Sequence, residues 1–378
     1  MDFEFTDDQL ELRENARSVL STACPRSLVR AVYEGGGSSA ALWAQLVGLD
    51  WPGLAIAEEH GGLGLGFVEV GVVVEELGRA VAPSPFLATV TQFATIVREA
   101  GSPDHALAFL PRVADGSLTG SLAIAEAGVW QPGAIRTTAR RVDAGWILSG
   151  TKSFVLDGAT AAEVAVVART PGTEGDDGLG VFVVPGAALR ARPLAVIDPT
   201  VPIAHITLDD VEVSSDRVLV EPGNPTAART VHRTLNEATT AIALSTVATC
   251  RAIFETTLQY AKDREQFGRP IGSFQALKHR LADMYLAVER ATSLGYFAAL
   301  TIAEDDDRSA VAASMAKAAA GDCQRLVAAD GLQLHGGIGF TWEHDLHFLL
   351  KRAKSGDALF GTASSHRALL ARLMGLVA

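Results

Sequence analysis

The sequence has few cysteines and few basic residues for its length. Cys24, Cys250 and Cys323 are the only cysteines among 378 residues. They are isolated and odd in number, which fits neither a disulfide framework nor a thiolate metal site, so we expect three small, buried side chains. The 32 lysines and arginines are outnumbered by 44 acidic residues, giving a formal net charge of −12. This balance argues against nucleic acid or an anionic membrane as the main partner.

Long apolar runs are also missing. None approaches the roughly 18–20 residues that cross a membrane. The N-terminal stretch MDFEFTDDQLELRENARSVL is acidic and amphipathic, without the basic start and apolar centre of a signal peptide. We therefore expect a cytoplasmic protein without a membrane span. The remaining composition, 48% hydrophobic and 20% charged, is typical of a globular protein with a large core.

The residue pattern changes twice along the chain and predicts three domains. Residues 1–117 show helical periodicity, with Thr6 as the expected cap of the first helix. Residues 118–224 form short β-branched runs separated by Gly, Pro and Asp, which favours an antiparallel barrel or sandwich. Residues 225–378 are helical again, as in an antiparallel four-helix bundle. We predict a mainly α fold with a central β domain. The long helices of the bundle are predicted at 227–265, 273–304 and 307–334.

A corner between two of these helices gathers basic and aromatic residues, in YAKDREQFGRPIGSFQALKHRLADM. The first helix is predicted to end at Phe267 and Gly268, and the next to begin near Ser273, a residue that caps helices well. Arg264 and Gln275 would lie at the same corner. An arginine near an aromatic ring beside a helix start suits a phosphate attached to a flat ring. An ordinary helical hairpin with surface arginines fits the spacing as well.

Three glycines follow the last long helix, in GLQLHGGIGFTWEHD. Gly336, Gly337 and Gly339 each weaken a helix by roughly 0.5–1 kcal/mol relative to alanine. Their presence indicates that another molecule or segment approaches the backbone closely at this point.

Six motifs, in order, resemble the acyl-CoA dehydrogenase family. They are PGLAIAEEHGGLGLG, AIAEAG, GTKSFVLDGA, LDDVEVSSDRVL, DREQFGRPIGSFQ and QLHGGIGFT. Each is weak alone, but together they cover essentially the whole chain. The resemblance implies the fold predicted above, an FAD cofactor, and α,β-dehydrogenation of an acyl-CoA thioester in fatty acid or lipid metabolism, such as β-oxidation.

The resemblance also implies which residues bind FAD. The FAD molecule whose pyrophosphate approaches the glycine segment would be bound mainly by the neighbouring subunit, and its flavin ring would lie against the β domain of that subunit. The implied residues are Gln333, Gly336 and Gly337 at the pyrophosphate, Arg264, Phe267 and Gln275 at the adenosine end, Ile124, Ala125 and Phe154 beside the flavin ring, and Thr362 near the cofactor. Shared sites of this kind imply a homodimer or homotetramer. An electron-transfer flavoprotein is the expected electron acceptor.

The catalytic base departs from the family pattern. A carboxylate must remove the α-proton while the flavin takes the β-hydrogen as hydride. Where many members have Tyr-Glu-Gly-Thr, this chain has Phe360 in LFGTASSHR, and phenylalanine cannot take a proton. Other members carry the glutamate on the first long helix of the bundle, where gap-free counting reaches Ala238, with Glu237 beside it. Glu237 is the candidate base and Asp357 a weaker one. The alternative for Glu237 is a solvated carboxylate in the first turn of its helix.

Two further motifs have structural interpretations. Ala125, Glu126 and Ala127 stand where the family often has Thr-Glu-Pro, so one hydroxyl near the flavin is missing and Glu126 is expected to be structural. The spacing of His344 and His347 suggests metal ligands, but a polar surface explains it without a further ligand pair, and we expect no metal.

Several functions stay open from the sequence. One is a homo-oligomeric dehydrogenase with an unusual base. A second is a subunit of a heteromeric dehydrogenase whose partner supplies the base, since GIGFTWEHDLHFLLKRA resembles actinobacterial members that act on steroid side chains in such assemblies. A third is an acyl-CoA-binding homologue without activity, and a flavin oxidase or monooxygenase is a fourth.

Overall fold

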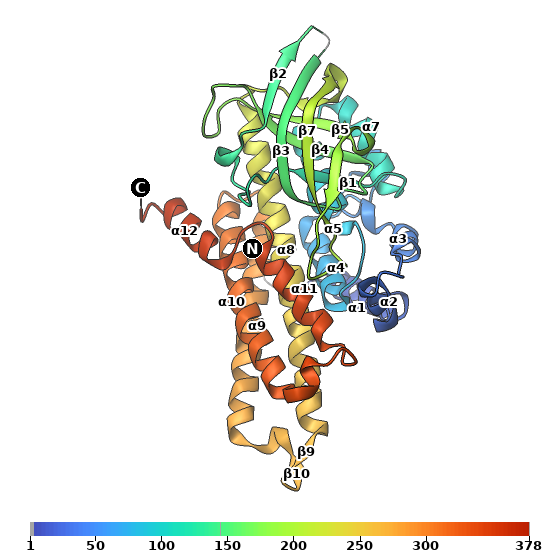
Figure 1. The fold of residues 1–378 in the computed structure, drawn as a ribbon, viewed down its shortest axis with the longest axis vertical. Helices are drawn as coiled ribbons and strands as arrows, with labels where there is room; N and C mark the ends of the chain where they lie inside the picture. The colour runs from blue at the N-terminus through green and yellow to red at the C-terminus, as the bar shows by residue number, and fades with distance from the viewer. Residues whose placement is uncertain (1–3, 144, 378) are drawn as a thin grey trace. The chain divides into compact units, whose positions relative to one another are not determined.

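The computed structural model (Figure 1) describes residues 4–143 and 145–377. The chain divides into two compact units. A helical unit contains the chain up to Ser38, Phe67–Pro83 and the chain from Thr239 onward. A mixed unit contains Ser39–Gly66 and Ser84–Ala238. The segment predicted as one N-terminal domain contributes helices to both units, and the three predicted domain boundaries stay a prediction.

The mixed unit is built from short helices and one sheet. Its helices are α3 (Ala40–Val47), α5 (Phe86–Ala88), α6 (Thr95–Ala100), α7 (Pro103–Ala114) and the start of α8 (Thr226–Asp263). Its strands are β1 (Gly120–Ala123), β2 (Thr138–Val142), β3 (Gly145–Leu156), β4 (Glu163–Arg169), β5 (Leu179–Pro185), β6 (Arg190–Pro193), β7 (Ile203–Ser214) and β8 (Val218–Val220).

The eight strands form one sheet with the order β6-β7-β3-β2-β4-β5-β8, and β1 pairs with β4. Most neighbouring strands are antiparallel, as predicted; β3 and β7 form the long central pair in Figure 1. Two pairs differ from the prediction, because β4 lies parallel to both β1 and β2. The β1–β4 pairing extends over four residues and the β2–β4 pairing over the single pair Thr138 and Arg169, and the short runs of the sequence do not encode these directions.

Alternate residues of β4 and β5 enter two different cores. Ala165 and Val181 belong to a core that includes Ile96 of α6 and Phe109 of α7. Val164, Val166, Phe182 and Val184 point the other way, into a core shared with β3 and β7. Because both faces of β4 are covered, its seven residues are all buried, which explains why its sequence is a continuous apolar run rather than an alternating one. Strands from both halves of the sheet enclose the second core, as in a barrel or sandwich.

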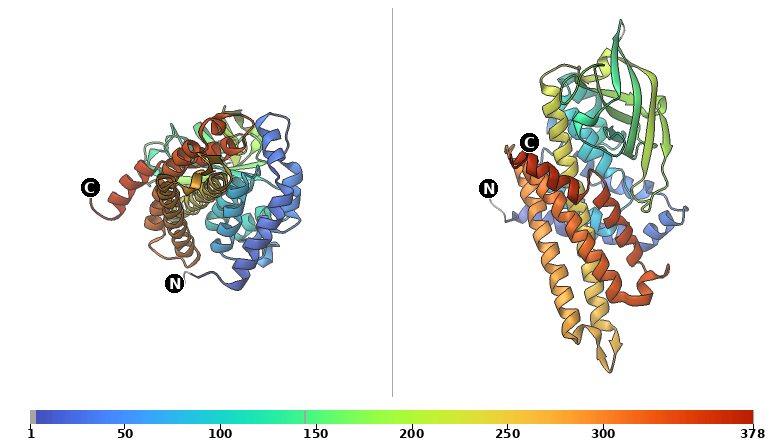
Figure 2. Two further views of the ribbon diagram at one scale, coloured as in Figure 1. Left: turned by 90° about the horizontal axis from the view of Figure 1, so that it is seen from below. Right: turned by 60° about the vertical axis from the view of Figure 1, so that its left-hand side comes forward.

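The helical unit is a bundle with additional helices from the N-terminal part of the chain. Its elements are α1 (Asp7–Ala23), α2 (Arg26–Tyr33), α4 (Phe67–Ala80), most of α8, the hairpin strands β9 (Glu265–Gln266) and β10 (Arg269–Pro270), α9 (Gln275–Ala303), α10 (Ser309–His335), α11 (Leu346–Ala358) and α12 (Ala363–Leu373). Figure 2 shows the long helices α8, α9 and α10 running alongside one another. Thr6 begins α1 with a capping box to Gln9, as predicted.

Small residues allow close helix contacts in this bundle. A Cβ on Gly78 of α4 would lie 2.5 Å from the Ser245 carbonyl oxygen of α8, and Thr249 donates to the Gly78 carbonyl at 2.9 Å. The helix α8 contains an apolar window of mean hydropathy 1.2, long enough to cross a membrane, but 78% of that window is buried inside the protein. Its apolar character is therefore explained by its place in the core. All three cysteines are buried and form no disulfide bond, as predicted.

The corner after α8 differs from the prediction. The helix ends at Asp263, before Phe267, and β9 pairs with β10 in a two-residue hairpin. Its turn residues Phe267 and Gly268 both have positive φ, +55° and +75°, as the mirror-image hairpin turns require. Ser273 does not cap α9, because it lies in a 3₁₀ turn and Phe274 takes the cap position without a side-chain hydrogen bond.

Candidate functional site

The two predicted glycines lie where α10 ends. Gly336 is the first residue beyond the helix and has φ +62° and ψ −142°, a conformation that is essentially restricted to glycine. A Cβ on Gly336 or Gly337 would meet no atom within 4 Å. Close packing within the chain therefore does not explain the two glycines. The backbone at Gly336 and Gly337 is open, whereas a Cβ on Gly339 would lie 3.0 Å from the Cβ of His335, so packing within the chain explains that third glycine. The approach of another molecule to the first two stays a prediction.

The helix end beneath these glycines is held by His335. Its Nδ1 lies 2.8 Å from the Gly331 carbonyl oxygen, and its ring stacks on Tyr260 with centroids 4.5 Å apart. Burial lowers the pKa of His335, so the ring is neutral near pH 7 and donates from Nδ1. The neighbouring residues Ile338 and Phe340 are exposed, and they continue the open surface.

The predicted adenosine-binding residues lie around the β9–β10 hairpin. Phe267 at its tip is 91% exposed. Arg264, Gln275 and Gln333 are also exposed. In the described part of the chain their side chains make no hydrogen bond or ion pair. A free guanidinium and two free amides are available for a phosphorylated ligand.

The mixed unit brings the other predicted flavin contacts together. The Ser153 backbone N–H donates to the Ala125 carbonyl at 2.8 Å, which places the end of β1 beside Phe154. Phe154 has φ +53° and stacks on Trp130 with centroids 5.8 Å apart. Ile124 is buried, whereas Phe154 is partly exposed. The predicted flavin contacts here are therefore the aromatic ring of Phe154 and the backbone of Ala125.

Glu126 and Lys152 form a largely buried ion pair next to Ala125 and Phe154. Lys152 is fully buried, and its Nζ lies 2.7 Å from Glu126 Oε1. Glu126 also accepts hydrogen bonds from the backbone N–H groups of Arg136, at 2.6 Å, and Thr137, at 3.0 Å. Burial lowers the pKa of Lys152 to about 8, against the opposing effect of the Glu126 carboxylate. Burial alone would raise the pKa of Glu126, but Lys152 and Thr137 lower it.

The segment that carries Phe360 is fixed by two side chains. Lys317 of α10 donates from Nζ to the carbonyls of Asp357, at 2.9 Å, and Gly361, at 2.7 Å. His366 of α12 donates from Nε2 to the Phe360 carbonyl at 2.8 Å. Phe360 itself is 5% exposed. The position where many relatives have a glutamate is thus a buried phenylalanine in a rigidly bonded turn.

Burial changes the titration of both anchoring side chains. It lowers the pKa of Lys317 to about 8 and that of His366 to about 4. The nearby Asp357 carboxylate pairs with Lys354 at 2.9 Å, so it is engaged in a local ion pair. The Thr362 hydroxyl accepts from the Ser365 N–H as the cap of α12 and lies 3.4 Å from the Ser365 hydroxyl oxygen.

Glu237 is buried about three turns into α8, contrary to the first-turn alternative. The helix begins at Thr226, and Glu237 is 2% exposed. Its Oε2 accepts from the Thr95 hydroxyl at 2.8 Å, and its Oε1 pairs with Arg98 Nη2 at 2.6 Å. Ala238, at the gap-free position, is fully buried. The solvated alternative fails because α6 covers this face of α8.

A cavity of about 320 Å³ in the mixed unit is lined by Arg98. Apolar residues such as Ile56, Val90 and Leu110 form most of its wall, together with Glu59. Thr95 and Arg98 follow a π-helical segment, Thr89–Ala94, a rare distortion that shifts the phase of the residues after it. Arg98, the ion-pair partner of Glu237, lines this cavity, whereas Glu237 itself does not.

Sequence reasoning missed Thr95, Arg98, Lys152, Lys317 and His366. A signal existed for the lysines, since Lys152 lies in a strand that is mostly buried and Lys317 in an alanine-rich helix, and a buried lysine needs partners. No such signal marked Thr95 or Arg98. His344 contacts His335 through its ring, and His347 stacks on Trp342. Within residues 4–143 and 145–377, no three His, Cys, Asp or Glu side chains form a group that could hold a metal.

Comparison with known proteins gives consistent matches over the chain. The family model for the acyl-CoA dehydrogenase N-terminal domain matches residues 6–117, and the model for the C-terminal domain matches residues 228–375. The acyl-CoA dehydrogenase IpdE2 of Mycobacterium tuberculosis is 30% identical, over 97% of this chain and 96% of its own length.

Two solved structures extend the comparison. The Tcur3481-Tcur3483 steroid ACAD is 32% identical with a TM-score of 0.87, and the match covers 98% of both chains. The ChsE4-ChsE5 complex of Mycobacterium tuberculosis contains a chain that is 25% identical with a TM-score of 0.89, over 100% of both chains.

Proposed function

Because the chain belongs to the acyl-CoA dehydrogenase family of flavin-dependent oxidoreductases, we propose that it binds FAD and dehydrogenates an acyl-CoA thioester between the α and β carbons. The open backbone at Gly336 and Gly337 carries the cofactor proposal. The positive φ of Gly336 explains that glycine, but neither a contact within the described chain nor a positive φ accounts for Gly337. FAD would supply the oxidant that accepts hydride from the substrate.

The residues of this chain fit an extended dinucleotide. The N–H groups and small residues at Gly336 and Gly337 leave room for a pyrophosphate, and the unpaired guanidinium of Arg264 suits the phosphate charge. In the mixed unit, Phe154 offers an aromatic surface held in position by the bond from Ser153 to Ala125. Gly336, Gly337 and Arg264 are open to solvent in the single chain. This exposure supports a cofactor that is shared between subunits, and therefore a homo-oligomer.

Glu237 is the proposed base that removes the α-proton. It is a buried carboxylate at the helix position next to Ala238, and Thr95 orients its Oε2. Taking up a proton on Glu237 weakens its pair with Arg98. The guanidinium can then turn toward the neighbouring cavity that it already lines. A carboxylate that is held in one orientation by Thr95 suits proton transfer from a carbon acid.

A second candidate is a heteromeric dehydrogenase in which a homologous subunit provides the base. The buried Phe360 favours it, because the usual glutamate position cannot accept a proton. The ChsE4-ChsE5 and Tcur3481-Tcur3483 proteins each carry a pair of names, so such pairing has a precedent among structural neighbours.

The test is to purify the chain alone, measure FAD per subunit from visible absorbance, and follow oxidation of acyl-CoA. The proposal expects about one FAD per subunit and turnover that depends on Glu237. Bound FAD without turnover, restored by co-expression of a homologous chain, would replace it with the heteromer. Absence of FAD and acyl-CoA binding, alone and with a homologue, would refute both.

A further inference from the structure

A second cavity, of about 360 Å³, lies in the helical unit between α1, α4, α8 and the start of α2. None of the residues assigned above to FAD, substrate chemistry or the base lines it. Its wall contains three arginines, Arg17, Arg26 and Arg79, and two glutamates, Glu76 and Glu255. Three cations therefore face two anions in one small space.

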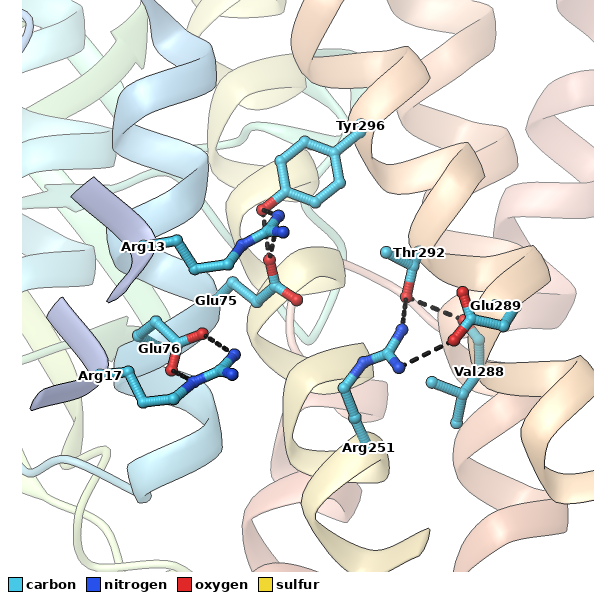
Figure 3. Close-up of polar contacts among 9 residues, drawn as sticks. All are labelled: Arg13, Arg17, Glu75, Glu76, Arg251, Val288, Glu289, Thr292 and Tyr296. Carbon is cyan, nitrogen blue, oxygen red and sulfur yellow. Dashed lines mark hydrogen bonds and ion pairs between the residues drawn. The ribbon is translucent and has the colours of Figure 1, made fainter. Parts of the chain in front are cut away.

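Two of the arginines each form an ion pair with one of the glutamates. Arg17 and Glu76 point toward each other and form two bonds, Nε–Oε2 at 3.1 Å and Nη2–Oε1 at 2.6 Å (Figure 3). Arg79 pairs with Glu255, Nη1–Oε1 at 2.9 Å. In the network beside them, Arg13 and Tyr296 share the Glu75 carboxylate, as Figure 3 shows, while Arg13 Nε has no hydrogen-bond partner among the described residues. None of these carboxylates is left over for a third cation.

Arg26 is the unmatched cation. Its only hydrogen bond in the described part of the chain is a long one, Nη1 to the Ala80 carbonyl at 3.4 Å. A guanidinium has five N–H donors, so most of them are unused. Burial lowers the pKa of Arg26, and Arg79 nearby adds to this effect. Arg26 is only partly buried, and none of its side-chain nitrogens is a fully buried atom without a partner. Its unused N–H groups are therefore accessible to an anion that enters the cavity it lines.

Neighbouring groups do not supply the missing charge by direct contact. The Asp345 carboxylate attracts Arg26 and opposes the fall in its pKa, but its Oδ1 is bonded to Arg30 at 2.6 Å. Burial raises the pKa of the Cys24 thiol to about 11, so this side chain stays neutral at physiological pH. Ser21 and Thr256 also line the cavity. The Ser21 hydroxyl already donates to the Ser18 carbonyl at 2.7 Å, whereas the Thr256 hydroxyl makes no hydrogen bond in the described part of the chain and can donate to an oxyanion.

We propose that this cavity binds a small oxyanion, a phosphate or carboxylate group, through Arg26, with the Thr256 hydroxyl as a further donor. The planar guanidinium suits bidentate contact with either group. The site is separate from the FAD and base residues, so it stands or falls independently of the proposed dehydrogenase activity.

The test uses the purified protein with FAD bound and titrates inorganic phosphate at constant ionic strength, by calorimetry. A parallel titration with succinate distinguishes a phosphate from a carboxylate ligand. We expect saturable binding of at least one of them in the range of about 0.01–1 mM. The variant Arg26→Gln should weaken it at least tenfold without changing acyl-CoA turnover.

Two further variants complete the design. Arg141→Gln removes an equal charge from an exposed ion pair in β2 and should bind the anion like the unmodified protein. Arg26→Lys keeps the charge but loses the planar fork, so it should show intermediate affinity and replaces Arg26→Gln if that variant does not fold. Equal affinity in all variants, or no saturable binding of either anion below about 10 mM, would overturn the proposal.

Discussion

Glu237 of α8 and Arg98 of α6 form an ion pair with Oε1 and Nη2 2.6 Å apart, although the two residues are 139 positions apart in the chain. Thr95, one turn before Arg98, donates to the other oxygen of the same carboxylate. Glu237 is therefore held on both oxygens by one short helix. This arrangement makes Glu237 a positioned buried carboxylate, and its role in proton transfer can be tested separately from its role in packing.

The first prediction concerns Glu237→Gln. Glutamine keeps the shape and can still bond to Thr95, but it cannot take a proton. The rate of flavin reduction by acyl-CoA should fall by about 10²–10⁴-fold, the usual contribution of a general base, while FAD content stays unchanged. Glu99→Gln, a change of another Arg98-bonded carboxylate on α6, is the control and should reduce flavin normally. Unaltered reduction in Glu237→Gln would remove Glu237 as the base.

The second prediction concerns the glycines. Gly337 has no positive φ, and a Cβ added to it would lie in open space, so Gly337→Ala should leave the melting temperature of the FAD-free chain unchanged. If pyrophosphate contacts this backbone, the added methyl group should lower FAD affinity at least tenfold. Gly36→Ala is a matched control, because Gly36 also has open space and no positive φ. Equal FAD affinity in both variants would contradict the placement of the pyrophosphate.

The third prediction concerns the buried pair beneath the flavin contacts. Lys152→Met leaves the Glu126 carboxylate without its cation, which should lower the free energy of unfolding by about 3–5 kcal/mol. The double variant Lys152→Met with Glu126→Gln should recover part of that loss, since no charge is then left unpaired. Urea denaturation measures both values. A double variant that is less stable than Lys152→Met would show that Glu126 stabilises the fold mainly through its backbone bonds.

The fourth prediction concerns pH and His366. Burial lowers the pKa of His366 from 6.5 to about 4, so between these values the unfolded chain binds the proton and the folded chain does not. The free energy of unfolding should therefore fall as pH drops from about 6.5 to 4, by about 3 kcal/mol from this group.

His366→Gln isolates that contribution. The glutamine amide can replace Nε2 as donor to the Phe360 carbonyl but does not titrate, so the decline between pH 6.5 and 4 should be shallower in this variant by the same amount. Urea unfolding at several pH values gives the comparison. Parallel curves for the variant and the unmodified protein would show that His366 is protonated in the folded state as readily as in the unfolded one.

Features of the fold that depend only on residues close together in the chain could be predicted from the sequence. The capping box at Thr6 needs only Gln9 three residues later, and the three isolated cysteines are buried as expected. The long helices of the bundle follow the alanine-rich apolar pattern to within a few residues. The order of helical, β and helical segments follows from the same periodicities.

Features that depend on contacts between residues far apart in the chain could not be predicted from the sequence. The parallel pairing of β4 with β1 and β2 is set by the path of the chain between strands. The burial of Glu237 depends on Thr95 and Arg98, which nothing in the sequence around Glu237 indicates. The end of α8 was misplaced because Phe267 at positive φ is unusual for a bulky side chain, and only the pairing of β9 with β10 determines it.

The role of Glu237 in dehydrogenation is best tested by adding acyl-CoA, without oxygen, to the chain purified alone with FAD, and recording the visible flavin absorbance. We predict rapid bleaching with at least one acyl-CoA, and slow or no bleaching with Glu237→Gln. FAD that stays oxidised in the unmodified protein with every acyl-CoA offered, although each is shown to bind, would contradict this role.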